Sequence, residues 1–206
     1  MPFVTHYLEV VMSLMDMLQQ RLGGDTVNRI SNQIGADPGT TNSAIMAALP
    51  LLVSAMARNT ADQGKAQSLS NAVSQDHDGS ILDDVPGYLD RQDTSAGKGI
   101  LKHVLGSRQT AAQSGLSQVT GMDQAKVGQL LTVLAPLVMG ALGKSQRERG
   151  LDGRGLATLL TSEQESLKQS SPGVMGGLNR FLDQDGDGSV LDDVGGMLGK
   201  AFGGKR

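Results

Sequence analysis

The residues best suited to chemistry in this 206-residue chain form one acidic loop near its C-terminal end, where residues 183–194 read DQDGDGSVLDDV. Carboxylate and carbonyl oxygens at alternate positions of a tight loop suit a hard cation such as Ca²⁺. Gly188 stands where an EF-hand loop needs a glycine for its sharp turn. The sequence therefore predicts a calcium site with these ligands: Asp183, Asp185, Asp187, Ser189 through its backbone carbonyl, and Asp193.

This loop departs from the EF-hand pattern at its twelfth position, where Val194 replaces the usual bidentate Glu. With Asp193 as the closing ligand the loop must close short, and we expect weak affinity, with a dissociation constant of about 10⁻⁴–10⁻³ M. Residues 183–193 hold five carboxylates and no Lys or Arg. Like charges about 4 Å apart cost about 1 kcal/mol per pair even in water, so a bound cation would relieve repulsion. The alternative is a solvated acidic turn that caps the next helix.

A second acidic loop, residues 74–85, matches the first at a separation of 109 residues. It reads SQDHDGSILDDV, so Ser74 replaces the leading Asp. Two interpretations stay open for it, a degenerate structural turn and a weaker ion site. The carboxylates at issue are Asp76, Asp78, Asp83 and Asp84.

Two apolar runs, residues 44–57 and 130–142, also match, because their central prolines, Pro50 and Pro136, lie 86 residues apart. Each run is shorter than the roughly 20 apolar residues of a membrane span, which favours buried core helices. Proline lacks a backbone donor and clashes one turn back, so a break or kink is expected in each run. We find no convincing alternation of apolar and polar residues of the kind typical of strands.

The predicted fold is therefore all-α and multihelical, with two related helical subdomains that arose by internal duplication and carry EF-hand-like acidic loops. The N-terminal segment is expected to be an extension, because Ser13 followed by Asp16 resembles a helix start. The expected organisation is an extension over 1–11, a first repeat over 12–91, a connecting helix and linker over 92–113, and a second repeat over 114–206.

Composition narrows the classes of function. The chain has no Cys, which excludes disulfides and thiol nucleophiles, and its net charge of −3 argues against binding nucleic acid through a broad basic face. The three histidines, His6, His77 and His103, lie far apart and form no metal-binding motif. No catalytic constellation or small-molecule site is evident, so we expect no enzyme.

The leading functional hypothesis is a structural or protein-interaction protein with a calcium-binding C-terminal loop. The alternative is a helical scaffold that associates with itself and uses no bound ion. Either hypothesis expects a protein partner or a second copy, and neither expects a membrane span.

Several segments in order resemble the YidB-like family of uncharacterised bacterial proteins, which is defined by a domain of unknown function. The resemblance covers most of residues 12–206 and implies a multihelical, cytoplasmic bacterial protein with no established activity. The segments that carry it are Met12–Leu14, Gly23–Asp25, Ala48–Leu52, Gly99–Gly106, Leu134–Gly140 and the acidic loop at 183–189.

Overall fold

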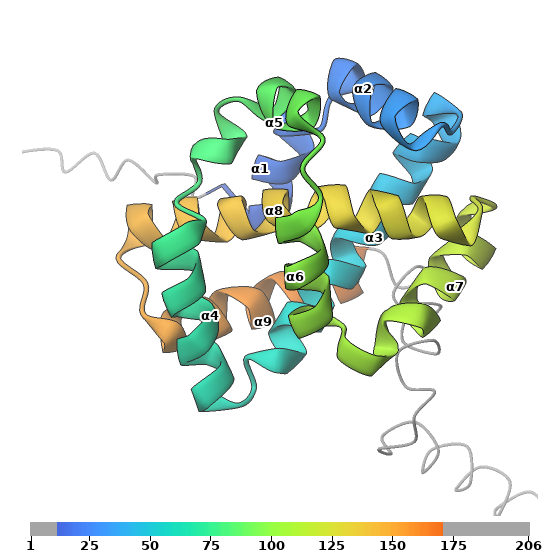
Figure 1. Cartoon of the computed structure of the whole chain (residues 1–206). Coiled ribbons are helices and arrows are strands. Elements are labelled where there is room, and N and C mark those ends of the chain that lie inside the picture. Colours follow the sequence, from blue (N-terminus) through green and yellow to red (C-terminus); the bar gives the residue numbers. More distant parts are fainter. Residues whose placement is uncertain (1–11, 171–206) are drawn as a thin grey trace, which may run out of the picture.

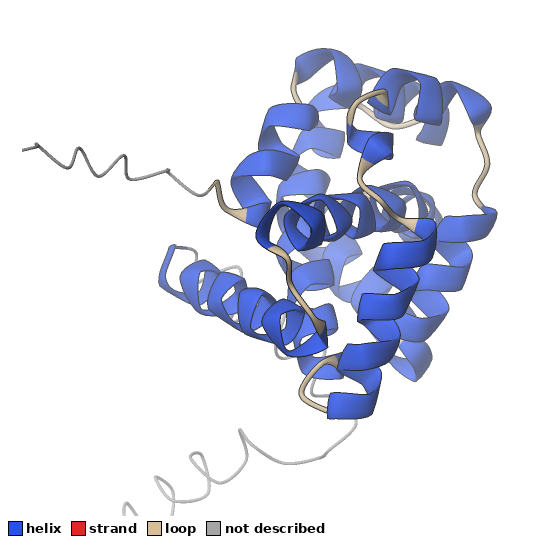
Figure 2. Cartoon of the chain, turned by 90° about the vertical axis from the view of Figure 1, so that its left-hand side faces the viewer, coloured by secondary structure: helices blue, strands red, loops and turns tan. Residues whose placement is uncertain are grey.

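The computed structural model describes residues 12–170, and this part of the chain is helical with no strand (Figures 1 and 2). The predicted all-α, multihelical fold class is confirmed. The elements are α1 (Leu14–Arg21), α2 (Gly24–Ile34), α3 (Pro38–Asn59), α4 (Gln63–Asp76), the 3₁₀ turn η1 (Ser80–Leu82), α5 (Val85–Arg91), α6 (Ser95–Val104), the 3₁₀ turn η2 (Gly106–Arg108), α7 (Gln109–Thr120), α8 (Gln124–Arg149) and α9 (Gly153–Ser170).

Several helices begin at polar residues that cap them. The Ser13 hydroxyl accepts a hydrogen bond from the backbone N–H of Asp16 at 3.0 Å. Asp37 accepts one from the N–H of Thr40 at 2.9 Å, and Asp123 accepts one from the N–H of Ala125 at 2.9 Å. The first N–H groups of a helix have no partner within it, so these side chains fix where α1, α3 and α8 begin.

The two apolar runs form the central helices, α3 and α8. Each is long and apolar enough to pass for a membrane span by length and composition, yet 78% of each apolar stretch is buried inside the protein. Both contribute to one core of Leu, Ile, Val, Met and Ala side chains. Packing within this core accounts for their apolar composition.

A break or a kink was the expectation at each proline, and a break is wrong, because α3 continues through Pro50 and α8 through Pro136. A proline inside a helix costs about 3 kcal/mol through its missing donor and its clash with the preceding turn. Both prolines lie in stretches whose neighbours are buried on all sides. Packing of this kind contributes most of a helix's stability in a folded protein, and it offsets the local cost.

An outer helix from each half of the chain packs on the central helix of the other half. Helix α4 packs on α8, and α9 packs on both α3 and α4. Helix α6 lies across α8, as Figure 1 shows in front of the long horizontal helix. The contact is close, since a methyl group on Gly97 would overlap the Thr132 carbonyl.

Residues that match at a separation of 86 have the same local roles. Gly35 ends α2 and Gly121 ends α7, each with a left-handed backbone at φ of 64° and 70°. Glycine suits both positions because this region is strained for other residues. Two residues later, Asp37 and Asp123 each cap a central helix.

Candidate functional site

The predicted calcium ligands of the C-terminal loop lie outside the described residues. The structure does describe the matching loop at 76–84, which connects α4 to α5 through η1. Its Gly79 has a left-handed backbone with φ of 92°. This glycine is the one that aligns with Gly188 in the C-terminal loop.

Two carboxylates of the described loop, Asp78 and Asp84, have separate structural roles. Asp78 accepts a hydrogen bond from the N–H of Ser80 at 3.0 Å and lies 3.8 Å from the Arg147 guanidinium. Asp84 caps α5 by accepting from the N–H of Gly87 at 2.9 Å. Hydrogen bonds from Ser80 lower the pKa of Asp78, with a smaller contribution from Arg147. Within residues 12–170 no three acidic or histidine side chains are grouped to hold a metal ion.

The loop sits on α8 at two glycines. A methyl group on Gly140 would overlap the Ile81 side chain, and one on Gly143 would overlap the carbonyl oxygen of His77. Because these positions lack a Cβ, the backbone of the loop approaches the helix directly. The backbone of the acidic loop is thereby fixed against the central helix.

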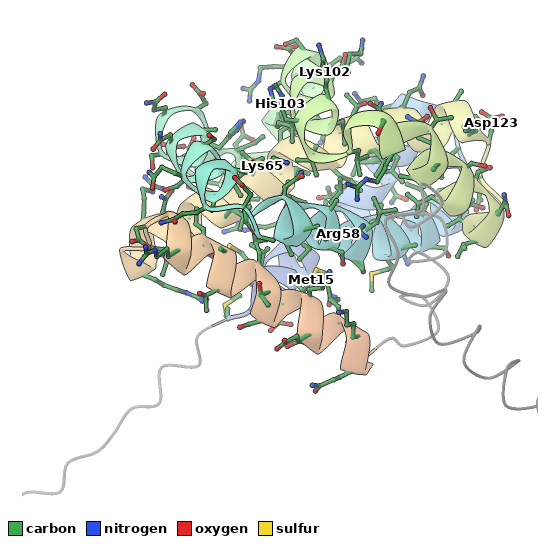
Figure 3. The ribbon with its side chains drawn as sticks, turned by 90° about the horizontal axis from the view of Figure 1, so that it is seen from below. Met15, Arg58, Lys65, Lys102, His103 and Asp123 are labelled. Carbon is green, nitrogen blue, oxygen red and sulfur yellow. The ribbon has the colours of Figure 1, made fainter. Side chains whose placement is uncertain are left out.

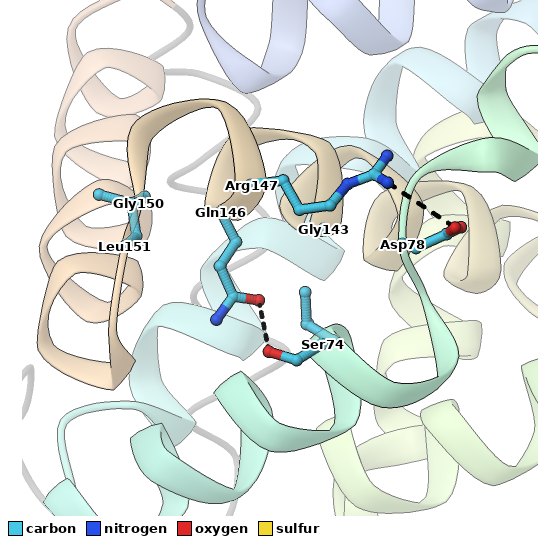
Figure 4. Close-up of a pocket in the computed structure, with 8 residues that line it drawn as sticks. Ser74, Asp78, Gly143, Gln146, Arg147, Gly150 and Leu151 are labelled. Carbon is cyan, nitrogen blue, oxygen red and sulfur yellow. Dashed lines mark hydrogen bonds and ion pairs between the residues drawn. The ribbon is translucent and has the colours of Figure 1, made fainter.

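A small pocket of about 290 Å³ lies beside this contact (Figure 4). Gln146 is its main polar side chain: its amide N–H donates to Ser70 Oγ at 2.8 Å, and its Oε1 accepts from Ser74 Oγ at 3.2 Å. Both hydrogen-bonding groups of the amide are therefore used to hold α4 on α8. The pocket is best explained as part of the packing between these helices.

A larger cavity than this pocket is a groove of about 800 Å³ between α4 and α6. Leu69 and Ala72 line it from α4, and Ile100 and Val104 line it from α6. Met56 of α3 and Met139 of α8 also line it. Polar side chains also line the groove, but most of its accessible surface is apolar, which is typical of sites that bind ligands or partner segments.

Three polar side chains of the groove, Asn59, Thr60 and His103, have hydrogen-bond partners within the fold. The Asn59 amide donates to the carbonyl oxygens of His103 and Val104 at 3.3 and 2.8 Å, which ties the end of α3 to the end of α6. Thr60 donates to the carbonyl of Ala57 at 3.0 Å. The His103 ring Nδ1 lies 2.8 Å from the Gly99 carbonyl. These contacts use the polar atoms for structure and leave the apolar walls to a ligand.

Charged groups differ between the two ends of the groove. Lys65, at the start of α4, and His103, near the end of α6, lie on one side of it, and both are labelled on the face shown in Figure 3. Asp76 and His77 mark the other end of α4. Burial lowers the pKa of His77, and the nearby Asp76 raises it by less, so the ring favours its neutral form.

The sequence alone does not reveal this groove. Lys65 and His103 are 38 residues apart, and their helices meet only because both pack beside the central pair. Gly99 lines the groove, but a helical glycine alone is not a sequence signal for a cavity.

The described fold is thus an all-helical protein with two buried central helices and an apolar groove. A family described as bacterial protein of unknown function (DUF937) matches residues 16–145, and the chain belongs to this YidB-like family. The match spans both central helices up to Ser145 and includes the groove. No curated protein and no solved structure matches this chain in the comparisons made.

Proposed function

We propose that this chain is a non-enzymatic, cytoplasmic protein-interaction protein that binds an amphipathic helix of a partner protein in the groove between α4 and α6. The observation that carries the proposal is the chemistry of the groove. Its walls are apolar, and Asn59, Thr60 and His103 make their hydrogen bonds within the fold. A site of this kind favours apolar contact over proton transfer or substrate polarisation.

The length of the groove supports a helix as the occupant. Lys65 and Asp76 lie eleven residues apart on α4, which corresponds to about 16 Å at 1.5 Å per residue. This length suits about three helical turns. Apolar side chains at i, i+4 and i+7 of the partner would contact Leu69 and Ile100.

The charges at the two ends favour a partner of matching polarity. Acidic side chains at one end of the partner helix would lie near Lys65 and His103, and a basic side chain at the other end would lie near Asp76. Charges at the rim of a site contribute to orientation and association rate more than to affinity. We therefore expect the apolar residues to set the affinity and the charges to set the direction.

The test uses a designed 14-residue amphipathic helix with leucines on one face, glutamates near one end and lysines near the other, made in both chain directions. Gly99→Leu places a larger side chain at the wall of the groove, and its Cβ meets open space. We expect the variant to weaken peptide binding at least about tenfold, a loss of about 1.4 kcal/mol. Gly24→Leu is the matched control, because Gly24 is also a helical glycine with open space around it, on α2.

Equal binding by the Gly99→Leu and Gly24→Leu variants would contradict the groove as the binding site. A dimer that forms without peptide and that Gly99→Leu disrupts would assign the groove to self-association instead. Light scattering at increasing protein concentration distinguishes these results from peptide binding.

We further propose that the chain is a duplication and that its C-terminal loop binds Ca²⁺. The matching roles of Gly35 and Gly121, and of Asp37 and Asp123, support the duplication. The left-handed Gly79 supports a sharp turn at the aligned Gly188.

Calorimetry of calcium binding tests the site, with Asp185→Ala and Asp187→Ala as the loss variants. The matched control is Asp78→Ala in the first loop. Unchanged heat in the Asp185→Ala and Asp187→Ala variants, or no heat in the unmodified chain, would overturn the calcium proposal.

A further inference from the structure

The groove between α4 and α6 has two halves, which the chain connections define. Helix α4 leads to α5 through η1, and α6 begins soon after α5, so the end of α4 and the start of α6 both lie toward α5 (Figure 1). The start of α4 follows α3, whose Asn59 amide binds the carbonyl oxygens of His103 and Val104 at the end of α6. The two walls therefore run in opposite directions, and we call the two parts of the groove the α5 half and the Asn59 half.

The apolar wall residues of the α5 half are smaller than those of the Asn59 half. The walls of the α5 half carry Ala72, Ala96 and Gly99. A Cβ added at Gly99 would meet nothing within 4 Å, so the wall leaves open space there. In the Asn59 half the corresponding side chains are larger: Leu69, Ile100 and Val104.

The walls of the α5 half meet α8 at two separate points. Helix α6 meets it where a Cβ on Gly97 would overlap the carbonyl oxygen of Thr132. The end of α4 meets it where a Cβ on Gly143 would overlap the carbonyl oxygen of His77. Thr132 and Gly143 lie eleven residues apart, which corresponds to about 16 Å along α8. Packed helices have axes about 8–10 Å apart, so α4 and α6 are separated here by more than direct packing requires.

Met139 forms the floor between these two contact points. It lies seven residues after Thr132 and four residues before Gly143, so the three residues share one face of α8. Its side chain lines the groove and is 3% exposed. A methionine side chain adapts its shape easily, and its sulfur makes favourable contacts with the edges of aromatic rings. Small walls above a methionine floor therefore favour an aromatic side chain as the occupant of this half.

Asp76 places a negative charge at the rim of the same half. It is the last residue of α4, lines the groove and is exposed. Residues three or four apart lie on neighbouring turns of a helix, so a basic residue one turn from the aromatic residue of a partner helix would lie near this carboxylate. Aromatic residues and arginine are also the residues that most often dominate the energy of protein interfaces.

We infer that the partner helix carries one aromatic anchor, which enters the α5 half between Ala72, Ala96 and Gly99 and contacts Met139. A basic residue beside this anchor lies near Asp76, and aliphatic side chains of the partner occupy the Asn59 half. The inference rests on the proposed function, because it names the kind of helix that the groove selects.

Three versions of the designed peptide test the anchor, all in the chain direction that binds better. The leucine peptide has only leucines on its apolar face. The lysine-end peptide has tryptophan in place of the leucine nearest its lysines, and the glutamate-end peptide has tryptophan in place of the leucine nearest its glutamates. By calorimetry, we expect the lysine-end peptide to bind at least about fivefold tighter than the leucine peptide, and the glutamate-end peptide to bind no tighter.

Fluorescence gives a second measurement of where the ring lies. The chain has no Trp, so tryptophan emission from the complex comes from the peptide alone. We expect the emission of the lysine-end peptide to shift to shorter wavelength on binding and to become protected from quenching by iodide. The ring of the glutamate-end peptide should stay accessible to iodide.

Two matched pairs of variants locate the ring in the groove. Met139→Leu removes the sulfur from the α5 half, and Met56→Leu makes the same change three residues before Asn59. Ala96→Leu narrows the α5 half, and Ala125→Leu is its control, because both alanines are exposed second residues of their helices. We expect Ala96→Leu and Met139→Leu to lower the ratio of lysine-end to leucine peptide affinity at least about twofold, while both controls keep it.

The outcomes separate this inference from the proposed function. Binding of the leucine peptide with no gain for the lysine-end peptide, or with equal gains for both tryptophan peptides, overturns the aromatic anchor and leaves the groove as a helix site. A gain that Ala96→Leu and Met139→Leu leave unchanged also overturns it. Failure of all three peptides to bind overturns the proposed function and the anchor with it. Circular dichroism checks each variant, and Ala96→Leu, at an exposed position, keeps the test decisive should Met139→Leu disturb the core.

Discussion

The Glu163 carboxylate accepts a hydrogen bond from the backbone N–H of Leu14 at 2.8 Å, across 149 residues of sequence. Leu14 is the first residue of α1, and Glu163 is buried in α9 with 7% exposure. A helix begins with N–H groups that lack partners within it. Here the last described helix supplies one of those partners to the first.

Removing this carboxylate should destabilise the fold. Glu163→Ala leaves the buried N–H of Leu14 without a partner, which costs about 1–3 kcal/mol. Glu163→Gln keeps an acceptor oxygen and should cost less. Urea denaturation measures both, with Glu165→Ala, on an exposed residue of α9, as the control. Equal losses for Glu163→Ala and Glu165→Ala would contradict a structural role for the hydrogen bond.

Substitution by alanine at two glycines in α6 should change the stability of the protein in opposite directions. Gly97→Ala forces α6 away from the Thr132 carbonyl and should destabilise the protein by about 1–3 kcal/mol. Gly99→Ala meets open space and should stabilise it by about 0.5–1 kcal/mol, because alanine restricts the unfolded chain. Thermal unfolding measures the difference. Similar melting temperatures for the two variants would show that α6 does not approach α8 this closely in solution.

Tyr88 should make stability fall at alkaline pH. Its hydroxyl donates to the Val133 carbonyl at 3.0 Å, and burial raises its pKa to about 12, with a smaller contribution from Asp93. The unfolded chain loses this proton near pH 10, so the stability is present below pH 10 and is lost between about pH 10 and 12. Tyr88→Phe should cost about 0.5–1.5 kcal/mol at neutral pH, and this difference should shrink across that window. Denaturation of both proteins over the pH range checks it, and a constant difference would contradict the assignment.

His77 should contribute a loss of stability at acidic pH. Burial lowers its pKa below the ordinary value of 6.5, so protonation favours the unfolded chain. The stability is present above pH 6.5 and is lost as the pH falls below it. His77→Gln should reduce the loss between about pH 7.5 and 5, measured by urea midpoints. Gln75→Ala, which changes an exposed residue of α4 that carries no titratable group, is the control.

The sequence predicts those features of the fold that depend on residues close together in the chain. Ser13, Asp37 and Asp123 identify helix starts because a cap acts on the next turn, and the apolar runs identify the two central helices. The expected break at Pro50 is wrong because tertiary packing outweighs a local cost. The predicted ligands from Asp183 to Asp193 remain a prediction, since they lie outside the described residues.

The groove and the link between Glu163 and Leu14 depend on chain topology. Asn59 joins α3 to α6 through backbone carbonyls, which any residue could supply, so no side-chain pattern marks the contact. Similarly, nothing near Leu14 in sequence indicates an acceptor in α9. Such contacts can be identified only from the three-dimensional arrangement of the helices.

The crossing of α4 onto α8 and of α9 onto α3 has a consequence for synthesis of the protein. As the chain leaves the ribosome, α3 emerges long before the helix that covers it, and its apolar run has no complete partner until about residue 170. Neither half of the chain can complete a hydrophobic core without the other half. We therefore expect a nascent chain released before α9 to be a target for chaperones and proteases, while the finished chain folds as one cooperative unit.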